Sequence, residues 1–348
     1  DDEGVLVPRG NYTITGLTHE GLDARYEMSY YNPGTPVWKT ADGSGGWGGD
    51  HPDPIRVAMA GDMTILSWPL AEGGSGLIGL NPEGRKVWGE RRGAKWLAAD
   101  ENYLYAVGKD HLKHLLTINR MRVKDGGYAP FVLDGKARAF DLHLKDILGS
   151  EDEVAVFAAI ARYQNTLILA FADGMVAVLD AATAVPRKRL AVPGIIALAA
   201  KGDRLYGATE TAVFAVDVKD GKTTPIPVAG VGKITDLAID NSGNILVADM
   251  GPDKQVKAFT TAGKPVYTCG VKGGRPIRGT YNAQAMLRVS SIDVDHSGRV
   301  WAVERWANPR RVSVWSARTG TLVKDYVGNT GYSARSTWMS DDPDFAYA

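Results

Sequence analysis

Cysteine is nearly absent from this chain, whose 348 residues include only Cys269. A single cysteine excludes an internal disulfide and a metal site built mainly from thiolates, so we expect Cys269 to be a small buried residue at a strand end. Long apolar runs are missing too, because no stretch approaches the roughly 20 residues of a membrane-spanning helix. Neither charge is in excess, since 40 Lys and Arg balance 40 Asp and Glu. We therefore expect no membrane span and no nucleic-acid partner.

Several motifs that would identify a chemistry are missing as well. The sequence contains no G-x-x-x-x-G-K-[ST] phosphate loop, no G-x-S-x-G nucleophile turn and no C-x-x-C-H haem-attachment site. The first residues, "DDEGVLVPRG", are acidic and then polar, which is unlike a signal peptide and is typical of a mature or trimmed terminus. Evidence for function must therefore come from the organisation of the fold and its loops.

Turn-forming and aromatic residues are plentiful, with 41 Gly, 17 Pro, 9 Trp and 14 Tyr. This composition favours many short strands joined by tight turns. Two segments, Ile234–Gly270 and Val289–Gly328, align as copies of one unit. Each has an apolar strand, a D-x-S-G turn, a second strand, a polar loop, a third strand, a turn that contains Gly, and a fourth strand. Such a unit predicts a four-stranded antiparallel meander.

Four further stretches repeat this order with a weaker pattern. The predicted units lie at about residues 55–89, 94–126, 154–190, 195–227, 234–270 and 289–328. Repeats of roughly 40 residues that each form a four-stranded sheet are typical of a β-propeller. A series of β-sandwiches fits less well, because sandwich strands do not repeat in fours. The sequence therefore predicts an all-β propeller of six to seven four-stranded blades.

The last two units also resemble the NHL repeat, whose pattern runs approximately I-x-V-D-x-x-G-x-I-Y-V-A-D and ends in a G-K-x-V stretch. The first copy matches at Ile239, Asp240, Gly243, Asn244, Val247, Ala248, Asp249 and Gly263. The second copy differs, because Glu304 occupies the position of Asp249. The resemblance implies a propeller and leaves the activity open.

The N-terminal residues "DDEGVLVPRGNYTI" resemble the end of a FlgD-type immunoglobulin-like domain, whose last strands read D-x-x-G-x-x-V-P-x-G-x-Y. The matching residues are Asp2, Gly4, Val7, Pro8, Gly10 and Tyr12. The resemblance implies that residues 1–15 are the tail of a preceding domain, or an N-terminal strand, and that residues 16–348 form the propeller. It also implies an exported, extracellular or cell-surface protein with other domains. Residues 20–31 and 336–348 would supply a split seventh blade.

Function is expected on one face of the propeller. In a meander, the turns between strands one and two and between strands three and four lie on one face. The loops between strands two and three lie on the opposite face with the connections between blades. The long loops that we assign to this second face, the long-loop face, are residues 31–54, 67–76, 108–114, 124–153, 250–254, 270–287 and 305–310. Insertions gathered on one face usually mark the binding face.

Tryptophans and polar residues in or beside these loops are candidate ligand contacts. Exposed tryptophan stacks on sugar rings or anchors peptides, and arginine pairs with carboxylates. The candidates are Trp47, Asp50, His51, Trp68, Glu72, Arg275, Arg278, Tyr281, Arg305 and Trp306. Two alternatives stay open: the tryptophans pack against their own loops, or the charged residues form ion pairs at the loop bases.

Acid–base catalysis is a second interpretation of the same face, with an acidic glycan as substrate. The candidate catalytic residues are Glu304, Tyr281, Arg278 and His51. A metal ion is also open. Zinc favours imidazole and carboxylate ligands such as Asp50, His51, His111 and His114. Calcium favours oxygen-rich loops, and "DNSGN" (240–244) resembles part of one, although a tight turn explains the same residues without an ion.

These observations favour a binding module that recognises a protein or glycan through the long-loop face. A lyase or hydrolase that acts on an acidic glycan is one alternative, and a structural building block of a surface assembly is another. A deep polar pocket at the propeller mouth with a perturbed carboxylate or histidine would favour the enzyme. A broad face with exposed tryptophan would favour the binding module.

Overall fold

The computed structural model of the chain describes residues 7–9, 13–15, 27–28, 55–71, 74–90, 94–109, 115–149, 157–192, 194–275, 282–305, 311–327, 338–339 and 346–347. These ranges contain strands, turns and a five-residue helix, α1 (Leu144–Leu148). Within them, no helix has the length and apolar character needed to cross a membrane.

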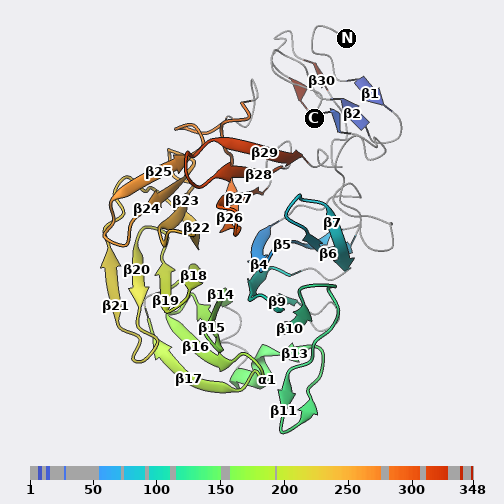
Figure 1. Cartoon of the computed structure of the whole chain (residues 1–348), viewed down its shortest axis with the longest axis vertical. Helices are drawn as coiled ribbons and strands as arrows, with labels where there is room; N and C mark the ends of the chain where they lie inside the picture. Colours follow the sequence, from blue (N-terminus) through green and yellow to red (C-terminus); the bar gives the residue numbers. More distant parts are fainter. Residues whose placement is uncertain are drawn as a thin grey trace.

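Six four-stranded antiparallel sheets follow one another around the ring in Figure 1. Blade 1 contains β4 (Arg56–Ala60), β5 (Met63–Ala71), β6 (Gly74–Leu80) and β7 (Lys86–Glu90); blade 2 contains β8 (Trp96–Ala99), β9 (Tyr103–Lys109), β10 (Leu116–Arg122) and β13 (Leu142–His143). Blade 3 contains β14 (Phe157–Tyr163), β15 (Thr166–Phe171), β16 (Met175–Asp180) and β17 (Pro186–Ala191); blade 4 contains β18 (Ala197–Lys201), β19 (Arg204–Ala208), β20 (Val213–Val216) and β21 (Thr223–Ile226). Blade 5 contains β22 (Ile234–Ile239), β23 (Ile245–Asp249), β24 (Gln255–Phe259) and β25 (Pro265–Cys269); blade 6 contains β26 (Val289–Val294), β27 (Arg299–Glu304), β28 (Arg311–Ser316) and β29 (Leu322–Val327).

The first strand of every blade lies at the centre of the ring and packs against the first strands of both neighbouring blades. The last blade meets the first one through β26 and β4, so the ring closes with six blades. The predicted all-β propeller is therefore confirmed. The sequence predicted six to seven blades, and the structure has six. Each blade is built from one continuous segment, so no strand is exchanged between the two ends of the repeat array.

Three small sheets complete the described chain. They are the sheet of β1 (Val7–Arg9), β2 (Thr13–Thr15) and β3 (Glu27–Met28), the pair β30 (Trp338–Met339) and β31 (Ala346–Tyr347), and the hairpin β11 (Val132–Leu133) and β12 (Lys136–Ala137). The predicted immunoglobulin-like tail falls on a segment of which only these short strands are described, and it stays a prediction. The split seventh blade expected from residues 20–31 and 336–348 has no place in the ring, because β26 packs directly against β4.

Blade 2 differs from the sequence prediction in its fourth strand. We expected the unit to end near residue 126, but β13 is the fourth strand and pairs with β10 through Ile118 and Leu142. Residues 123–141 therefore connect strands three and four and lie opposite the long-loop face, where they form the β11–β12 hairpin. The assignment of all of residues 124–153 to the long-loop face was wrong for this part, because a two-residue strand shows no apolar alternation.

The D-x-S-G turns form as the sequence predicts. Asp240 Oδ1 accepts hydrogen bonds from the backbone N–H of Ser242 at 2.8 Å and of Asn244 at 2.9 Å. Gly243 has φ +83°, a conformation that costs glycine little and other residues more. Gly298 in the matching turn of blade 6 has φ +73°. These contacts fix the end of the first strand and the start of the second.

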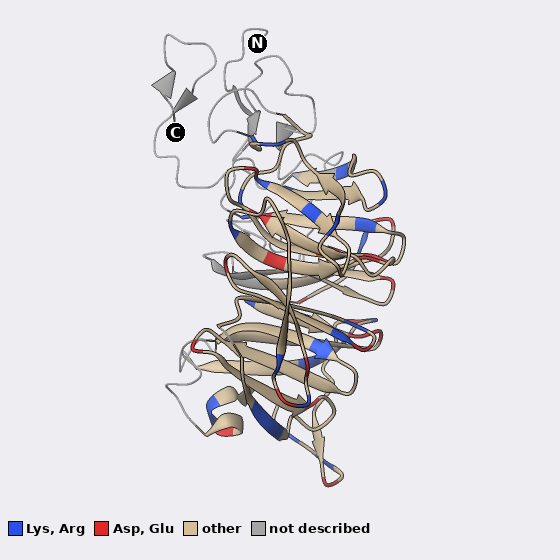
Figure 2. Ribbon diagram, turned by 90° about the vertical axis from the view of Figure 1, so that its left-hand side faces the viewer, with Lys and Arg blue, Asp and Glu red and all other residues tan. Residues whose placement is uncertain are grey.

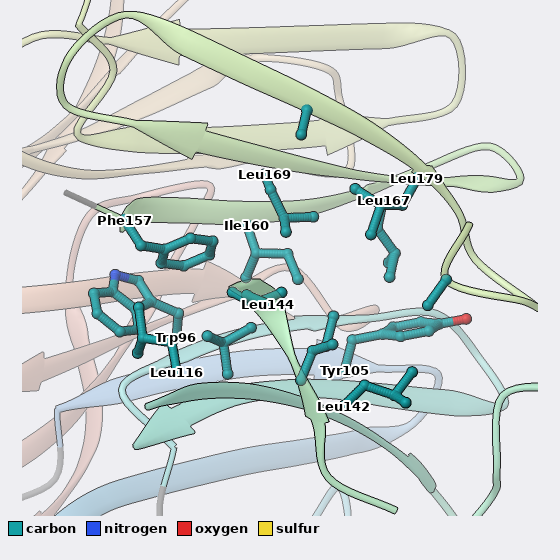
Figure 3. Close-up of a cluster of buried hydrophobic side chains, with 14 of the residues drawn as sticks. Trp96, Tyr105, Leu116, Leu142, Leu144, Phe157, Ile160, Leu167, Leu169 and Leu179 are labelled. Atoms are coloured by element: carbon teal, nitrogen blue, oxygen red, sulfur yellow. The ribbon is translucent and has the colours of Figure 1, made fainter. Parts of the chain in front are cut away.

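The core lies between neighbouring blades. Figure 3 shows the cluster between blades 2 and 3, where Trp96, Phe157 and Leu144 meet aliphatic side chains of β15 and β16. The rings of Trp96 and Phe157 meet edge to face with centroids 4.8 Å apart, and Phe157 meets Phe171 in the same way at 5.3 Å. Such pairs each add about 0.5–1.5 kcal/mol beyond the burial of their area. Each blade is therefore held mainly by apolar contact with the next.

Candidate functional site

The long-loop face is held at its base by a buried ion-pair cluster in blade 6. Glu304 ends β27, and both it and Arg311 at the start of β28 have no measurable exposure. Glu304 Oε1 accepts a hydrogen bond from Arg311 Nη1 at 3.0 Å. Oε2 accepts bonds from Arg275 Nη2 at 2.9 Å and from the backbone N–H of Leu287 at 2.9 Å. Glu304 therefore joins the two ends of the loop at residues 270–288.

Arg311 continues this network into the same loop. Its Nη1 donates to the carbonyl oxygen of Ala285 at 2.9 Å, and its Nη2 donates to that of Ala283 at 2.5 Å. Arg275 is 2% exposed, so all three charged groups are removed from water. Buried charges of this kind are tolerated only where each has charged and hydrogen-bonding partners, as here.

A second anchor occupies the corresponding position in blade 5. Asp249 ends β23 and is fully buried. Its Oδ1 accepts backbone N–H bonds from Gly232, Lys233 and Gly251, each at 3.0 Å, and its Oδ2 accepts a bond from Lys257 Nζ at 2.7 Å. Burial alone would raise the pKa of Asp249, but the Lys257 ammonium and these N–H groups hold it below the ordinary value. Asp249 thus fixes the blade 4 to blade 5 connection against the loop that follows β23.

The two anchors share one design. An acid ends the second strand of the blade, a cation stands on the third strand, and the acid accepts N–H bonds from the adjoining connection between blades. This is the ion pairing at loop bases that the sequence left open as an alternative. It uses both oxygens of each carboxylate, and it leaves Glu304 without the accessible oxygen that a catalytic acid or base needs.

Several other sequence candidates can be placed only in part. Arg275, expected to contact a ligand, instead pairs with Glu304 inside the fold, which does not fit ligand binding. Arg305 is partly buried at the end of β27, and its backbone N–H donates to Arg288 at 3.0 Å. Trp68 lies in β5, where only the backbone is described. The candidates outside the described residues are Trp47, Asp50, His51, Glu72, His111, His114, Arg278, Tyr281 and Trp306.

The described residues do not add to the metal-binding candidates that the sequence suggested. Among the described residues, no group of three or more His, Cys, Asp or Glu side chains is arranged to hold a metal ion. In the "DNSGN" turn, Asp240 Oδ2 accepts hydrogen bonds from Asn244 Nδ2 at 2.8 Å and from the Tyr267 hydroxyl at 3.2 Å. Asp240 therefore acts as a turn-capping residue, as the alternative to calcium binding predicted. The zinc candidates all lie outside the described ranges.

A central channel with polar side chains in its lining lies among the described residues, and we did not predict it from the sequence. The cavity has a volume of about 270 Å³ and is lined by the first strands of all six blades. Blades 2, 3 and 4 line it mainly with Ala, Leu and Ile. Blades 1, 5 and 6 contribute the polar side chains Arg56, Asp236, Ser291 and Asp293, and blades 3 and 4 contribute Arg162 and Lys201. The available signal was the presence of acids inside two apolar first strands, "ITDLAI" and "VSSIDV".

Charges elsewhere on the molecule are mixed. Figure 2 shows Lys and Arg interspersed with Asp and Glu over the described ribbon, with neither sign collected on one side of this view. This distribution agrees with the balanced composition and with the absence of a sequence signal for nucleic-acid binding.

Comparison with known proteins assigns the chain to no family. No protein-family model matches the chain, and no curated protein matches it. Among solved structures, the crystal structure of the RRP9 WD40 repeats is similar, with 14% identity, a TM-score of 0.49, and coverage of 86% of this chain and 87% of that one. At this identity the likeness concerns the fold alone. The strand order and the closed ring of inner strands establish that the chain is a six-bladed β-propeller.

Proposed function

We propose that this propeller is an interaction module that binds a partner protein through its long-loop face. The observation that carries the proposal is the pair of anchors at Asp249 and Glu304. Each fixes the chain between two blades to the base of a loop on this face. A preorganised loop platform loses less conformational entropy on binding than a platform that must order, so it is suited to recognition.

The same observation weakens the enzyme alternative. Asp249 and Glu304 end the second strands of blades 5 and 6, and both are occupied by cations and backbone N–H groups. Two other carboxylates, Asp236 and Asp293, line the channel, but each accepts an N–H from the first strand of the next blade. A carboxylate that holds two blades together is poorly placed to exchange a proton with a substrate.

The proposal can be tested by site-specific photo-crosslinking in the cell that produces the protein. One photoreactive residue would replace Lys272 or Glu210, which are exposed on the long-loop face. Matched control sites would be Arg318 and Gln164, exposed in turns on the opposite face. We expect a discrete adduct from Lys272 or Glu210, and protease digestion of that adduct shows that the partner is a protein.

Two outcomes would contradict the proposal. Adducts that form only from Arg318 or Gln164 would place the partner on the wrong face. An adduct whose added mass resists protease and is removed by glycan-cleaving reagents would make the partner a glycan, which was the other ligand class that the sequence favoured.

We also propose that the protein is exported and displayed at the cell surface. The support is the resemblance of residues 1–15 to the end of a FlgD-type domain. Surface labelling of intact cells with an impermeant amine reagent tests this, because the exposed Lys219 and Lys222 should react without cell lysis. Labelling that requires lysis would contradict it.

A further inference from the structure

The long-loop face carries an excess of positive charge at blades 5 and 6. The segments that form or adjoin this face there, which we call the basic sector, are residues 227–233, 249–257, 270–288 and 304–311. They contain ten Lys and Arg but only three Asp and Glu, whereas the whole chain has 40 of each sign. Eight of these cations and all three acids lie among the described residues. The rest of the chain has the opposite excess.

The acids of the basic sector do not neutralise its outer surface. Asp249 and Glu304 are fully buried at the bases of the loops. The side chain of Asp253 is 22% exposed and lies 2.6 Å from Lys257 Nζ, with Lys272 Nζ further away at 3.7 Å. The acids therefore stabilise the base of the sector, and the charged side chains that it presents to solvent are mainly cations.

Five of the described cations reach solvent on this face. Lys233, Lys272 and Arg288 are exposed, and Lys254 and Arg305 are half-buried. They lie on one continuous surface, because a backbone N–H of each loop donates to a carbonyl oxygen of its neighbour. These bonds run from Met250 to Lys233 at 2.7 Å, from Gly273 to Asp253 at 2.8 Å and from Arg305 to Arg288 at 3.0 Å.

Two of the five cations have a backbone conformation that favours glycine. Lys254 has φ +49° and Arg288 has φ +53°. This left-handed region is strained for a residue with a Cβ atom, whereas glycine enters it without that strain. The backbone at these positions therefore does not call for a long cationic side chain, and a role in binding accounts for one.

We propose that the basic sector binds an acidic peptide segment of the partner protein, whose carboxylates lie against Lys233, Lys272 and Arg288. This inference rests on the proposed function and specifies the chemistry of the partner. Clusters of arginine and lysine recognise acidic motifs through charge-assisted hydrogen bonds, and complementary charge accelerates association.

A short acidic segment fits the basic sector better than a long polyanion such as a nucleic acid. The sector covers two of the six blades, and the rest of the chain has more Asp and Glu than Lys and Arg. A polyanion that extends beyond the sector would be repelled by this negative excess, whereas a segment confined to the sector would not.

Fluorescence anisotropy with a labelled peptide tests the inference. The probe is a peptide of about twelve residues in which Glu and Ser alternate. The sector variant combines Lys233→Gln, Lys272→Gln and Arg288→Gln. The control variant removes the same charge from exposed turns on the opposite face and combines Lys219→Gln, Lys264→Gln and Arg318→Gln. The Kd of the sector variant should exceed that of the wild type by about tenfold, because each exposed ion pair contributes a factor of roughly 1.4 to 5. The control variant should bind like the wild type.

Three outcomes would overturn the inference. Equal weakening in the two variants would mean that the probe responds to net charge and not to the basic sector. The wild type might instead give no binding of the probe, and a protein adduct from the Glu210 crosslinking site would then still support the proposed function. Tighter binding of an oligonucleotide or a sulfated glycan of equal charge would replace the acidic peptide by that class of polyanion.

The reverse combination separates the two proposals. Probe binding that weakens only in the sector variant, without a protein adduct in the cell, would support the preference of the basic sector for acidic chains and contradict the proposed function.

Discussion

Arg311 Nη1 lies 3.0 Å from Glu304 Oε1, and both side chains are completely buried at the base of a loop on the long-loop face. The two residues face each other on adjacent strands, because β27 and β28 pair Glu304 with Arg311 in register. The pair therefore follows from strand register, and its effect is to hold the loop at residues 270–288 through Arg275 and Leu287.

Replacement of Glu304 should destabilise the whole protein. Glu304→Gln leaves two buried guanidinium groups without a countercharge, and breaking a buried ion pair from one side costs about 3–5 kcal/mol. The free energy of unfolding, measured by denaturant titration, should fall by this amount. The matched control is Glu210→Gln, whose exposed pair with Lys233 at 3.7 Å should contribute less than about 1 kcal/mol. Equal losses of unfolding free energy in the two variants would contradict the role of Glu304 as a buried anchor.

The contribution of Asp249 to stability should depend on pH. The pKa of Asp249 in the folded protein lies below its ordinary value of 3.8, so its stabilising contribution is present above that pH and is lost as the pH falls through the folded-state pKa. We expect Asp249→Asn to unfold at lower denaturant than the wild type at about pH 6, and the difference to narrow towards about pH 3. A difference that stays constant or widens in acid would show that the Lys257 pair is not the source.

Two adjacent glycines in the loop at residues 270–288 distinguish the cost of a strained backbone from the cost of a steric clash. Gly273 and Gly274 both have positive φ, +90° and +64°. A Cβ atom on Gly273 would meet nothing within 4 Å, whereas one on Gly274 would lie 2.4 Å from the carbonyl oxygen of Met286. Gly273→Ala should cost about 1 kcal/mol, the usual loss for a left-handed residue. Gly274→Ala should cost roughly 1–3 kcal/mol more, because the loop must move. Thermal unfolding of both variants checks this, and equal melting temperatures would contradict it.

Cys269 should be chemically inert in the folded protein. It is fully buried at the end of β25, as the sequence predicted, and burial raises the pKa of its thiol to about 12. The thiolate that attacks disulfide reagents is therefore scarce and inaccessible at neutral pH. An aromatic disulfide reagent should release no chromophore from the native protein and one equivalent after unfolding. Rapid reaction of the native protein would show that the strand opens locally.

Much of the fold could be predicted because its signals are local. The Asp–Gly turns at Asp240 and Gly243 and the alternation of apolar residues identified the meander of blade 5, and the repeat of that meander identified the propeller. The fourth strand of blade 2 was missed because β13 has two residues, and pairing with β10, rather than its own composition, makes it a strand.

The candidate site was less predictable because it depends on partners far apart in the sequence. Glu304 looked like a catalytic acid at the end of a strand, and the partner Arg275 that removes it from water lies 29 residues earlier. The polar side chains of the channel could not be grouped from the sequence either, since Met59 and Asp293 are 234 residues apart and meet only when the ring closes.

The sequence by itself determined the all-β propeller, the meander within each unit and the turns that cap its strands, because these depend on residues a few positions apart. Only the tertiary structure decided that six blades close the ring, that Arg275, Glu304 and Arg311 are anchors, and that Asp236 and Asp293 line the channel. The physical reason is burial. Whether a carboxylate binds a ligand or stabilises the fold depends on how far it is removed from water and on which distant strand supplies its hydrogen bonds.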